Sequence, residues 1–328
     1  MLAVQVQELV KRFGSDVRAV DGVTFEVEAG TVFGLLGPNG AGKTTIVRIL
    51  ATIIPHDAGV ARVLGHDVGS EAQVVRGLIG LAGQFAAVDE NLTGKENLQM
   101  IGRLNHLPWP VVSERTADLL ERFDLTGAAS RPAKTYSGGM RRRLDVAAAL
   151  VARPRVLFLD EPTTGLDPQS RSDVWVMIEQ LVQGGTTVLL TTQYLEEADR
   201  LADHLVVIDH GKLIAEGTPA SLKAGLGATV LDIGMADTDA ALRAADALRS
   251  ARGLNPTVEG TTVELNVDDG PGVVSEALRV LQDCNLAPAT LALREPSLDD
   301  VFLALTGHRT DSDLATSDDG TNAKGPAK

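Results

Sequence analysis

A glycine-rich stretch that ends in a lysine and two threonines is the first part of this sequence that predicts chemistry. It matches the pattern G-x-x-x-x-G-K-[ST], whose backbone N–H groups and lysine surround the phosphates of a nucleotide. The stretch consists of Gly37, Pro38, Asn39, Gly40, Ala41, Gly42, Lys43, Thr44 and Thr45. Glycines let the backbone turn without Cβ clashes, so several N–H groups can point at one anion. We expect Lys43 to reach the β- and γ-phosphates and Thr44 to ligate Mg²⁺.

The sequence on either side of this stretch favours a phosphate loop over a chance glycine-rich turn. The apolar run Thr31–Leu36 predicts a buried strand before it, and Thr45–Leu50, without Gly or Pro, predicts a helix after it. The N-terminus of such a helix adds partial positive charge where a phosphate would bind.

Two further stretches place chemistry-bearing residues at the ends of expected elements. Val156–Leu159 is almost wholly apolar, which predicts a strand at the centre of a sheet, and the carboxylates Asp160 and Glu161 follow it directly. Tyr136-Ser137-Gly138-Gly139 precedes a helix expected over Met140–Ala152. A helix N-terminus and a flexible backbone coincide there, which predicts a second anion site.

Strand patterns alternate with helical patterns over the first two-thirds of the chain and predict a largely parallel α/β sheet. The alternating run Val4–Lys11 is typical of an edge strand. The other strands are expected at Val20–Val27, Thr31–Leu36, Val60–Leu64, Leu78–Ala82, Val156–Leu159, Thr187–Leu190, Leu205–Ile208 and Lys212–Glu216. Apolar residues recur at helical spacing from about residue 91 to 134, so residues 85–134 are expected to form a helical insertion.

The turn Gly225-Leu226-Gly227 is expected to end a first domain at about residue 224. Residues 225–309 have the element order of a small ferredoxin-like βαββαβ domain, of α+β class. Its first helix is expected over Ala240–Ala251, with Leu242, Ala245 and Leu248 on one side. Residues 310–328 are polar and are expected to be a disordered tail.

Composition limits the classes of partner. The chain has 328 residues, enough for two domains, and its formal net charge of −14 argues against sequence-independent binding of nucleic acid. The single cysteine, Cys284, cannot form an intramolecular disulfide, which fits a reducing cytosol. The chain has no apolar run of the roughly 18–20 residues that span a bilayer. We therefore expect a soluble protein that reaches a membrane only through a partner.

Taken together, the motifs resemble those of the ATP-binding subunits of ABC transporters. The resemblance covers about residues 4–218 and rests on the phosphate loop, Tyr136–Met140, the Asp160-Glu161 pair and the turn Gly165-Leu166-Asp167, in this order. Three segments look most like the daunorubicin/doxorubicin-resistance exporters and extend the resemblance to about residue 308: Arg141–Arg143, Gln193–Asp199 and Pro296–Phe302. The resemblance implies the P-loop NTPase fold of an ABC ATPase that binds and hydrolyses ATP with Mg²⁺.

The resemblance also assigns roles at the nucleotide. Lys43 and the loop N–H groups compensate phosphate charge, while Thr44 and Asp160 hold Mg²⁺, Asp160 through a water. Glu161 is the candidate general base that polarises the attacking water. Gln84 resembles the glutamine that joins Mg²⁺ and this water to the helical insertion, where the family docks on its membrane permease.

In the family, the segment Ser137-Gly138-Gly139 closes over the γ-phosphate of ATP held by the opposite subunit. The resemblance therefore implies a homodimer with two composite sites, and Asp167 resembles a residue that touches the partner subunit. Phe13 could stack on the purine base, where the family usually has Tyr, or could be a half-buried edge aromatic.

One position departs from the wider family. Gln193 replaces the usual switch histidine after its strand, as in the drug-resistance exporters. An amide can donate a hydrogen bond to the γ-phosphate, but it carries no positive charge and cannot shuttle a proton. We expect Gln193 to sense the γ-phosphate without charge, with Glu161 still acting as the base.

Two charged runs favour structural explanations. Arg141–Arg143 could reach phosphate, but the solvated flank of a helix is the favoured interpretation. Leu195–Asp199 is expected to be a solvated helix start, where acidic residues suit the helix dipole.

The resemblance favours an ATPase at the cytoplasmic face of the cell membrane that powers a separate permease exporting a drug-like or hydrophobic compound. Export of a lipid or other endogenous metabolite, and a non-transport ABC ATPase, are the alternatives. A neighbouring gene for a protein with about six apolar spans would favour transport over the last alternative. The C-terminal domain is expected either to stabilise the protein or its dimer, or to hold the permease and prevent unproductive closure.

Overall fold

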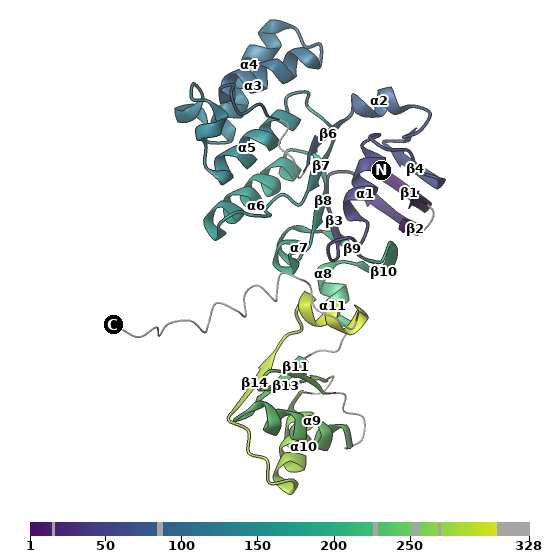
Figure 1. Cartoon of the computed structure of the whole chain (residues 1–328), viewed down its shortest axis with the longest axis vertical. Coiled ribbons are helices and arrows are strands. Elements are labelled where there is room, and N and C mark those ends of the chain that lie inside the picture. Colours follow the sequence, from purple (N-terminus) through teal and green to yellow (C-terminus); the bar gives the residue numbers. More distant parts are fainter. Residues whose placement is uncertain (15–16, 84–87, 226–228, 251–255, 268–269, 307–328) are drawn as a thin grey trace. The chain divides into compact units, whose positions relative to one another are not determined.

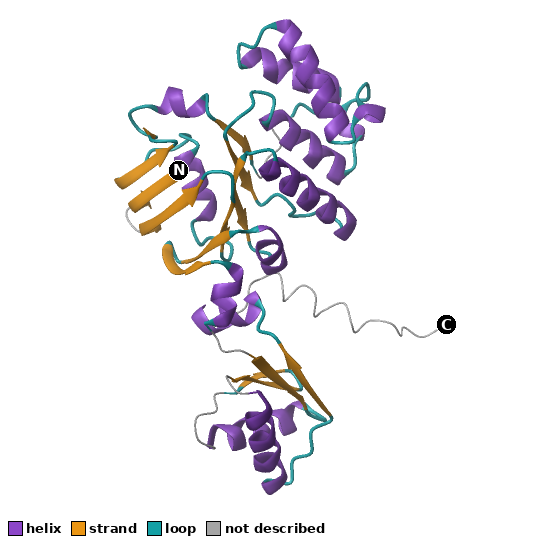
Figure 2. Cartoon of the chain, turned by 180° about the vertical axis from the view of Figure 1, so that it is seen from behind, coloured by secondary structure: helices purple, strands orange, loops and turns teal. Residues whose placement is uncertain are grey.

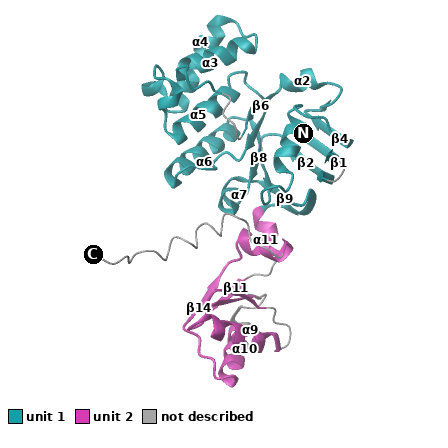
Figure 3. Ribbon diagram, in the orientation of Figure 1, with its two compact units in different colours: residues 1–218, 309–328 teal, residues 219–308 magenta. Residues whose placement is uncertain are grey.

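The computed structural model describes residues 1–14, 17–83, 88–225, 229–250, 256–267 and 270–306. Gln84, the centre of the expected turn at Gly225–Gly227, and the tail at 310–328 therefore lie outside the described residues. The chain divides into two compact units, Met1–Thr218, to which the terminal residues 309–328 are also assigned, and Pro219–His308 (Figure 3). The change of unit comes six residues before the domain limit at 224 expected from the sequence.

The first unit contains a four-stranded antiparallel sheet near the N-terminus. Its strands β1 (Leu2–Phe13), β2 (Val17–Glu28), β4 (Ala58–Val63) and β5 (His66–Asp67) lie in the order β2-β1-β4-β5. The expectation that the first strand is an edge strand is therefore wrong, because β1 pairs on both sides. Its alternation arises because one face packs on a core that includes Val4, Val6 and Leu9.

A six-stranded, largely parallel sheet forms the centre of this unit, as predicted (Figure 1). The strand order is β10 (Lys212–Gly217), β9 (His204–Asp209), β3 (Val32–Leu36), β8 (Thr187–Thr192), β7 (Val156–Asp160) and β6 (Ile79–Ala82), and only the β10–β9 pair is antiparallel. β3 and β8 occupy the centre, so β7 is an interior strand next to the β6 edge. Every residue of β7 is buried, because Leu157 and Leu159 enter one hydrophobic core and Phe158 enters the other.

Helices lie on both sides of the parallel sheet. α1 (Lys43–Leu50) lies on the side of the antiparallel sheet, whereas α5 (Gly138–Ala149) and α6 (Pro168–Gln183) lie on the opposite side (Figure 2). The remaining helices of this unit are α2 (Ala72–Arg76), α3 (Gly94–Leu104), α4 (Trp109–Arg122) and α7 (Leu195–Leu201). Among these described helices, α2 and α6 are not among the elements expected from the sequence.

The expected helical insertion consists of α3, α4 and two short 3₁₀ turns, Thr126–Ala128 and Ala133–Thr135. Thr93 and Glu96 form a reciprocal capping box at the start of α3. Among the described residues, no helix is long and apolar enough to cross a lipid bilayer.

The second unit starts with the short helix α8 (Pro219–Ala224) and continues in the order βαββαβ that the sequence predicts. Its elements are β11 (Thr229–Gly234), α9 (Thr238–Ser250), β12 (Thr257–Glu259), β13 (Thr262–Val267), α10 (Gly270–Asp283), β14 (Thr290–Arg294) and α11 (Leu298–Thr306). The sheet is antiparallel, with the strand order β12-β13-β11-β14.

The packing of α9 corrects one expectation. Ala245 and Leu248 are buried, but Leu242 is 53 % exposed. The buried face instead continues through Ala241 and Ala244, whose spacing with Ala245 and Leu248 is i, i+3, i+4 and i+7. Leu242 lies outside this stripe, so the helix is turned relative to the face expected from the sequence.

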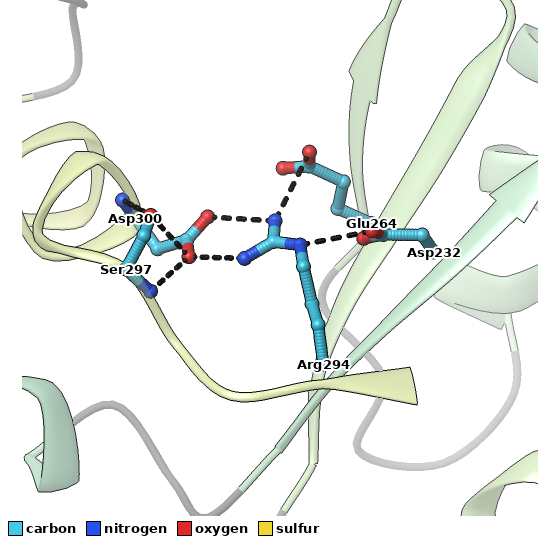
Figure 4. Close-up of polar contacts among 5 residues, drawn as sticks. All are labelled: Asp232, Glu264, Arg294, Ser297 and Asp300. Carbon is cyan, nitrogen blue, oxygen red and sulfur yellow. Dashed lines mark hydrogen bonds and ion pairs between the residues drawn. The ribbon is translucent and has the colours of Figure 1, made fainter. Parts of the chain in front are cut away.

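A polar network joins α11 to the sheet of the second unit (Figure 4). Arg294 at the end of β14 donates to both oxygens of Asp300, at 2.6 and 3.0 Å, and to Asp232 Oδ2 at 2.9 Å. Asp300 also accepts from the backbone N–H of Ser297, whose hydroxyl accepts from the Asp300 N–H. The Pro296–Phe302 segment singled out in the sequence thus contains a helix cap and one end of an ion-pair network.

Candidate active site

The phosphate loop lies between β3 and α1, as predicted, and two of its glycines have neighbours that exclude a side chain. A Cβ at Gly37 would collide with the carbonyl oxygen of Ile208, and a Cβ at Gly42 with that of Ala19. Gly42 also has a φ of 109°, which L-residues rarely adopt. α1 begins at Lys43, so the N–H groups of its first turn have no acceptor within the helix.

Lys43 lies inside this loop. Its ammonium donates to the carbonyl oxygens of Gly37 at 2.6 Å and Pro38 at 3.0 Å, and the residue is 4 % exposed. Burial lowers the pKa of Lys43, whereas the nearby charges of Glu161 and Asp160 act to raise it. The Lys43 ammonium lies 4.0 Å from Glu161 Oε1, so the phosphate loop and the end of β7 meet at one place.

Asp160 and Thr44 meet beside this lysine. Thr44 Oγ1 donates to Asp160 Oδ1 at 3.0 Å, and Thr191 Oγ1, from β8, donates to the same oxygen at 2.6 Å. Asp160 is only 4 % exposed. A hydroxyl and a carboxylate are the hard oxygen ligands that Mg²⁺ prefers, so the donor set fits that ion.

Glu161 has an unusual backbone. Its φ is 49°, a left-handed conformation that costs a non-glycine residue free energy unless its surroundings impose it. Its N–H lies 3.1 Å from the carbonyl oxygen and 3.0 Å from the hydroxyl of Thr191. Its side chain is 9 % exposed and accepts from Thr164 Oγ1 at 3.3 Å. The strain is therefore held at the residue predicted to act as general base.

The Ser137–Gly139 segment forms the start of α5, which begins at Gly138, two residues earlier than expected. The hydroxyl of Ser137 accepts from the Met140 N–H at 3.2 Å, so this hydrogen bond stays within its own helix. Gly138 lines a cleft of about 330 Å³ together with Glu161, Thr164, Gly165 and Leu166, among other residues. Asp167, at the end of this turn, caps α6 by accepting from Ser170.

The remaining site residues predicted from the sequence are Phe13, Gln193 and Gln84. Phe13, the last residue of β1, is 47 % exposed, with the ammonium of Lys11 5.6 Å from the centre of its ring. This residue is thus about half exposed, which fits both interpretations given for it from the sequence. Gln193 directly follows β8, and the N–H of Gly37 donates to the neighbouring Thr192 carbonyl at 3.3 Å. Gln84 lies outside the described residues.

The expectation that Arg141–Arg143 is a solvated helix flank holds for Arg141, whose side chain is 42 % exposed, whereas the side chain of Arg143 is only 20 % exposed. Arg141 pairs with Glu90 at 3.0 Å, and Arg143 pairs with Asp124 at 3.3 Å; both carboxylates are largely exposed. Arg142, by contrast, is largely buried and pairs with Asp145. Asp145 lies within an apolar segment three residues after Arg142, a spacing that could have signalled a buried pair.

Glu197 is also not solvated, which corrects the expectation for the acidic helix start. It is fully buried in α7 and accepts hydrogen bonds from Thr163 Oγ1 at 2.8 Å and Trp175 Nε1 at 3.0 Å. Trp175 belongs to the unexpected helix α6, so only the tertiary structure provides this partner. Because Thr163 follows the Asp160–Pro162 segment, Glu197 anchors the loop after β7 from the side of α7.

This burial predicts a pH dependence of stability. Burial raises the pKa of Glu197 above its ordinary value of 4.5, although hydrogen bonds and the charge of Arg142 oppose the shift. The folded protein therefore binds this proton more tightly than the unfolded chain, so the contribution to stability is lost as pH rises from about 4.5 through the folded pKa. Glu197→Gln should remove this loss. Urea unfolding of the wild type and of Glu197→Gln between pH 4.5 and 8 measures this loss of stability. The same change in the free energy of unfolding with pH in both proteins would contradict the prediction.

A family model described as ABC transporter matches residues 20–164. The daunorubicin/doxorubicin resistance ATP-binding protein DrrA of Streptomyces peucetius is 51 % identical over 94 % of this chain and 94 % of its own length. The doxorubicin resistance ATP-binding protein DrrA of Mycobacterium tuberculosis is 46 % identical over 95 % and 96 %, respectively. The linearmycin resistance ATP-binding protein LnrL of Bacillus subtilis is 36 % identical over 93 % and 98 %.

Solved structures agree with these relatives. An ATP-binding cassette of an ABC transporter in its ADP conformation superimposes with a TM-score of 0.60 at 28 % identity, covering 66 % of this chain and 91 % of that chain. The protein cbiO1 from Clostridium perfringens, part of an ABC transporter complex, gives a TM-score of 0.62 at 25 % identity, with coverages of 68 % and 91 %. The chain belongs to the family of ATP-binding subunits of ABC transporters and, within it, groups with the daunorubicin/doxorubicin resistance proteins.

Proposed function

We propose that this chain hydrolyses Mg²⁺-ATP at the carboxyl edge of its parallel sheet and so drives export of a drug-like or hydrophobic compound through a separate permease. The observation that carries the proposal is the meeting of Lys43, Thr44, Asp160 and Glu161 at the ends of β3 and β7. These residues supply a cation for phosphate, oxygen ligands for a metal and a base within a few ångströms of one another.

Each residue has a role in this proposal. Lys43 and the loop N–H groups bind the phosphates. Glu161 polarises the attacking water and accepts a proton from it. Gln193 donates its amide to the γ-phosphate, and Phe13 stacks the exposed part of its ring on the base. Thr44, Asp160 and Gln84 would hold Mg²⁺, which supplies compensation for the phosphate charge when bound.

A dimer completes the proposed site. The start of α5 at Gly138 provides a second anion site. The hydroxyl of Ser137 accepts from the Met140 N–H, so this hydrogen bond lies within the same helix. We propose that the segment Ser137–Gly139 of one copy covers ATP held by the phosphate loop of the other. Closure of two copies would then assemble two composite sites from one sequence.

The proposed location is the cytoplasmic face of the cell membrane, with a permease as the membrane contact. Export of drug-like compounds is supported by the relatives, which are named as daunorubicin, doxorubicin and linearmycin resistance proteins. The alternative, export of a lipid or other endogenous metabolite, has support of its own. A relative in Ralstonia nicotianae that is 41 % identical to this chain is named Nod factor export ATP-binding protein I. The second unit either stabilises the dimer or holds the permease.

The proposal is tested by drug accumulation in cells that express this chain together with its proposed membrane permease. We expect cells with the wild-type chain to accumulate less daunorubicin than cells with Glu161→Gln, because only the former can couple hydrolysis to export. A control without the permease should accumulate as much drug as the mutant. Equal accumulation in all three strains, for daunorubicin, doxorubicin and linearmycin alike, would contradict drug export.

A further inference from the structure

We propose that Arg142 is a positioning residue for ATP hydrolysis, which holds the backbone on both sides of Glu161 and so fixes the direction of its carboxylate. The proposal rests on the proposed role of Glu161 as the general base. Arg142 lies on α5, in the turn that follows the Ser137–Gly139 segment, and contacts neither the phosphate loop nor Lys43 in the described hydrogen bonds. It would act through Glu161 rather than on ATP.

The guanidinium of Arg142 forms hydrogen bonds with the backbone on both sides of Glu161. Its Nε donates to the carbonyl oxygen of Pro162 at 2.8 Å, and its Nη2 donates to the carbonyl oxygen of Asp160 at 3.3 Å. These two carbonyls belong to the residues immediately before and after Glu161. The Asp160 carbonyl belongs to the peptide unit that enters Glu161, and the Pro162 carbonyl belongs to the unit that leaves Pro162, so a rigid, planar fork that bonds both restrains the backbone before and after Glu161.

Arg142 also holds the end of the neighbouring strand, β6, so that its hydrogen bonds form a clamp on three backbone carbonyls. Nη1 of Arg142 donates to the carbonyl oxygen of Gly83 at 2.8 Å and to Asp145 Oδ2 at 3.2 Å. Gly83 directly follows β6 and precedes Gln84 in the sequence. Arg142 therefore fastens the ends of β6 and β7 to one helix, and the buried Asp145 balances its charge.

The need for such a clamp follows from the strained backbone of Glu161. A left-handed φ of 49° at a non-glycine residue persists only where several contacts impose it. Thr191 holds the Glu161 N–H from the side of β8, and Arg142 holds the adjacent carbonyls from the side of α5. Without Arg142, the backbone around Glu161 loses one of these two restraints, and the carboxylate can leave its position.

The simpler interpretation is that Arg142 only satisfies buried carbonyls and stabilises the fold. The two interpretations differ in what an Arg142 variant does once Glu161 is already absent. A positioning residue has nothing left to position, so its effect on turnover should vanish. A purely structural residue should lower stability, ATP binding and turnover whether or not Glu161 is present.

The test compares Arg142→Gln with Arg143→Gln in the full-length chain assembled with its permease. The control changes the next arginine of the same helix, whose partner carboxylate on Asp124 is 94 % exposed. We expect Arg142→Gln to lower the kcat of ATP hydrolysis about 100-fold, the order of effect of misplacing a catalytic group by about 1 Å. ATP affinity should change less than about threefold. Arg143→Gln should keep wild-type turnover, because the hydrogen bond described for Arg143 goes to a solvated carboxylate and not to the backbone beside Glu161.

The decisive comparison is made in the Glu161→Gln background. There, adding Arg142→Gln should leave the residual turnover unchanged and should still permit the ATP-bound dimer to form. A further loss of turnover by the same factor, loss of the dimer, or wild-type kcat in the single variant would overturn the proposal. High turnover in Glu161→Gln alone would instead refute Glu161 as base, which separates failure of the proposed function from failure of this inference.

Arg142→Lys keeps the test meaningful if Arg142→Gln does not fold. A single ammonium retains the charge beside Asp145 but cannot bond three carbonyls in the fixed geometry of a guanidinium. We expect a folded protein with unchanged ATP affinity and kcat about tenfold below wild type. Wild-type kcat in Arg142→Lys would show that charge alone suffices and would overturn the positioning role.

Discussion

Replacing Glu161 by Gln is expected to lower the rate of ATP hydrolysis by about 10²–10⁴-fold, the usual contribution of a positioned general base. Gln has nearly the shape of Glu and can fill the same 9 %-exposed position beside Lys43, but it cannot accept the proton of the attacking water. ATP binding should survive, so the variant should accumulate the ATP-bound dimer. Steady-state ATPase assays and size-exclusion chromatography with ATP measure the two effects.

Glu196→Gln is the matched control for this prediction. Glu196 is an exposed carboxylate in the first turn of α7, so its replacement should leave turnover near the wild-type value. A Glu161→Gln protein with more than a tenth of wild-type turnover would contradict the assignment of Glu161 as base. An inactive variant that no longer bound ATP would point to a structural defect instead.

Replacing Lys43 by Met is expected to weaken ATP binding about 10–100-fold and to abolish measurable hydrolysis. The physical reason is that the variant loses the only ammonium inside the described phosphate loop, and hydrogen bonds to charged groups contribute about 1.5–3 kcal/mol. Met keeps a similar length in a site that is 4 % exposed. Isothermal titration with Mg²⁺-ATP measures the affinity directly.

Lys212→Met is the control for the loss of a positive charge. Its ammonium is exposed and lies 3.9 Å from Asp21, so its removal should affect neither binding nor turnover. Together, the two site variants separate binding from chemistry: Lys43→Met loses both, whereas Glu161→Gln loses only chemistry. Equal ATP affinity in Lys43→Met and wild type would contradict the role of Lys43 in phosphate binding.

Several elements could be predicted because local sequence carries their signal. The strands with unbroken apolar runs, such as Val156–Leu159 and Thr187–Leu190, were recovered within two residues, because burial on both faces requires such runs. The βαββαβ order of the second unit followed from alternating periods of two and 3.6 residues. By contrast, α6 escaped prediction, although Asp167 and Pro168 provide a cap and an N1 proline at its start.

Local sequence could not decide which strands are neighbours. β1 alternates like an edge strand but pairs on both sides, because alternation reports only that one face is buried. The same limit applies to α9. Ala241 is buried and the adjacent Leu242 is exposed, because the tertiary packing decides which side of the helix is covered.

The sequence by itself determined the nucleotide chemistry of this protein. A phosphate loop needs its glycines, lysine and threonine at fixed spacing within one strand–helix connection, so the motif is complete in the eight consecutive residues Gly37–Thr44. The carboxylates Asp160 and Glu161 are recognisable for the same reason, since they directly follow a buried strand.

Only the tertiary structure decided how charged residues outside these motifs are used. Arg142 and Arg143 are adjacent and identical in type, yet one clamps the backbone around Glu161 and the other pairs with an exposed carboxylate. Glu197, in an acidic run, is buried against Trp175. The physical reason is that a charged side chain is buried only where partners from distant segments satisfy it, and no local pattern records those partners.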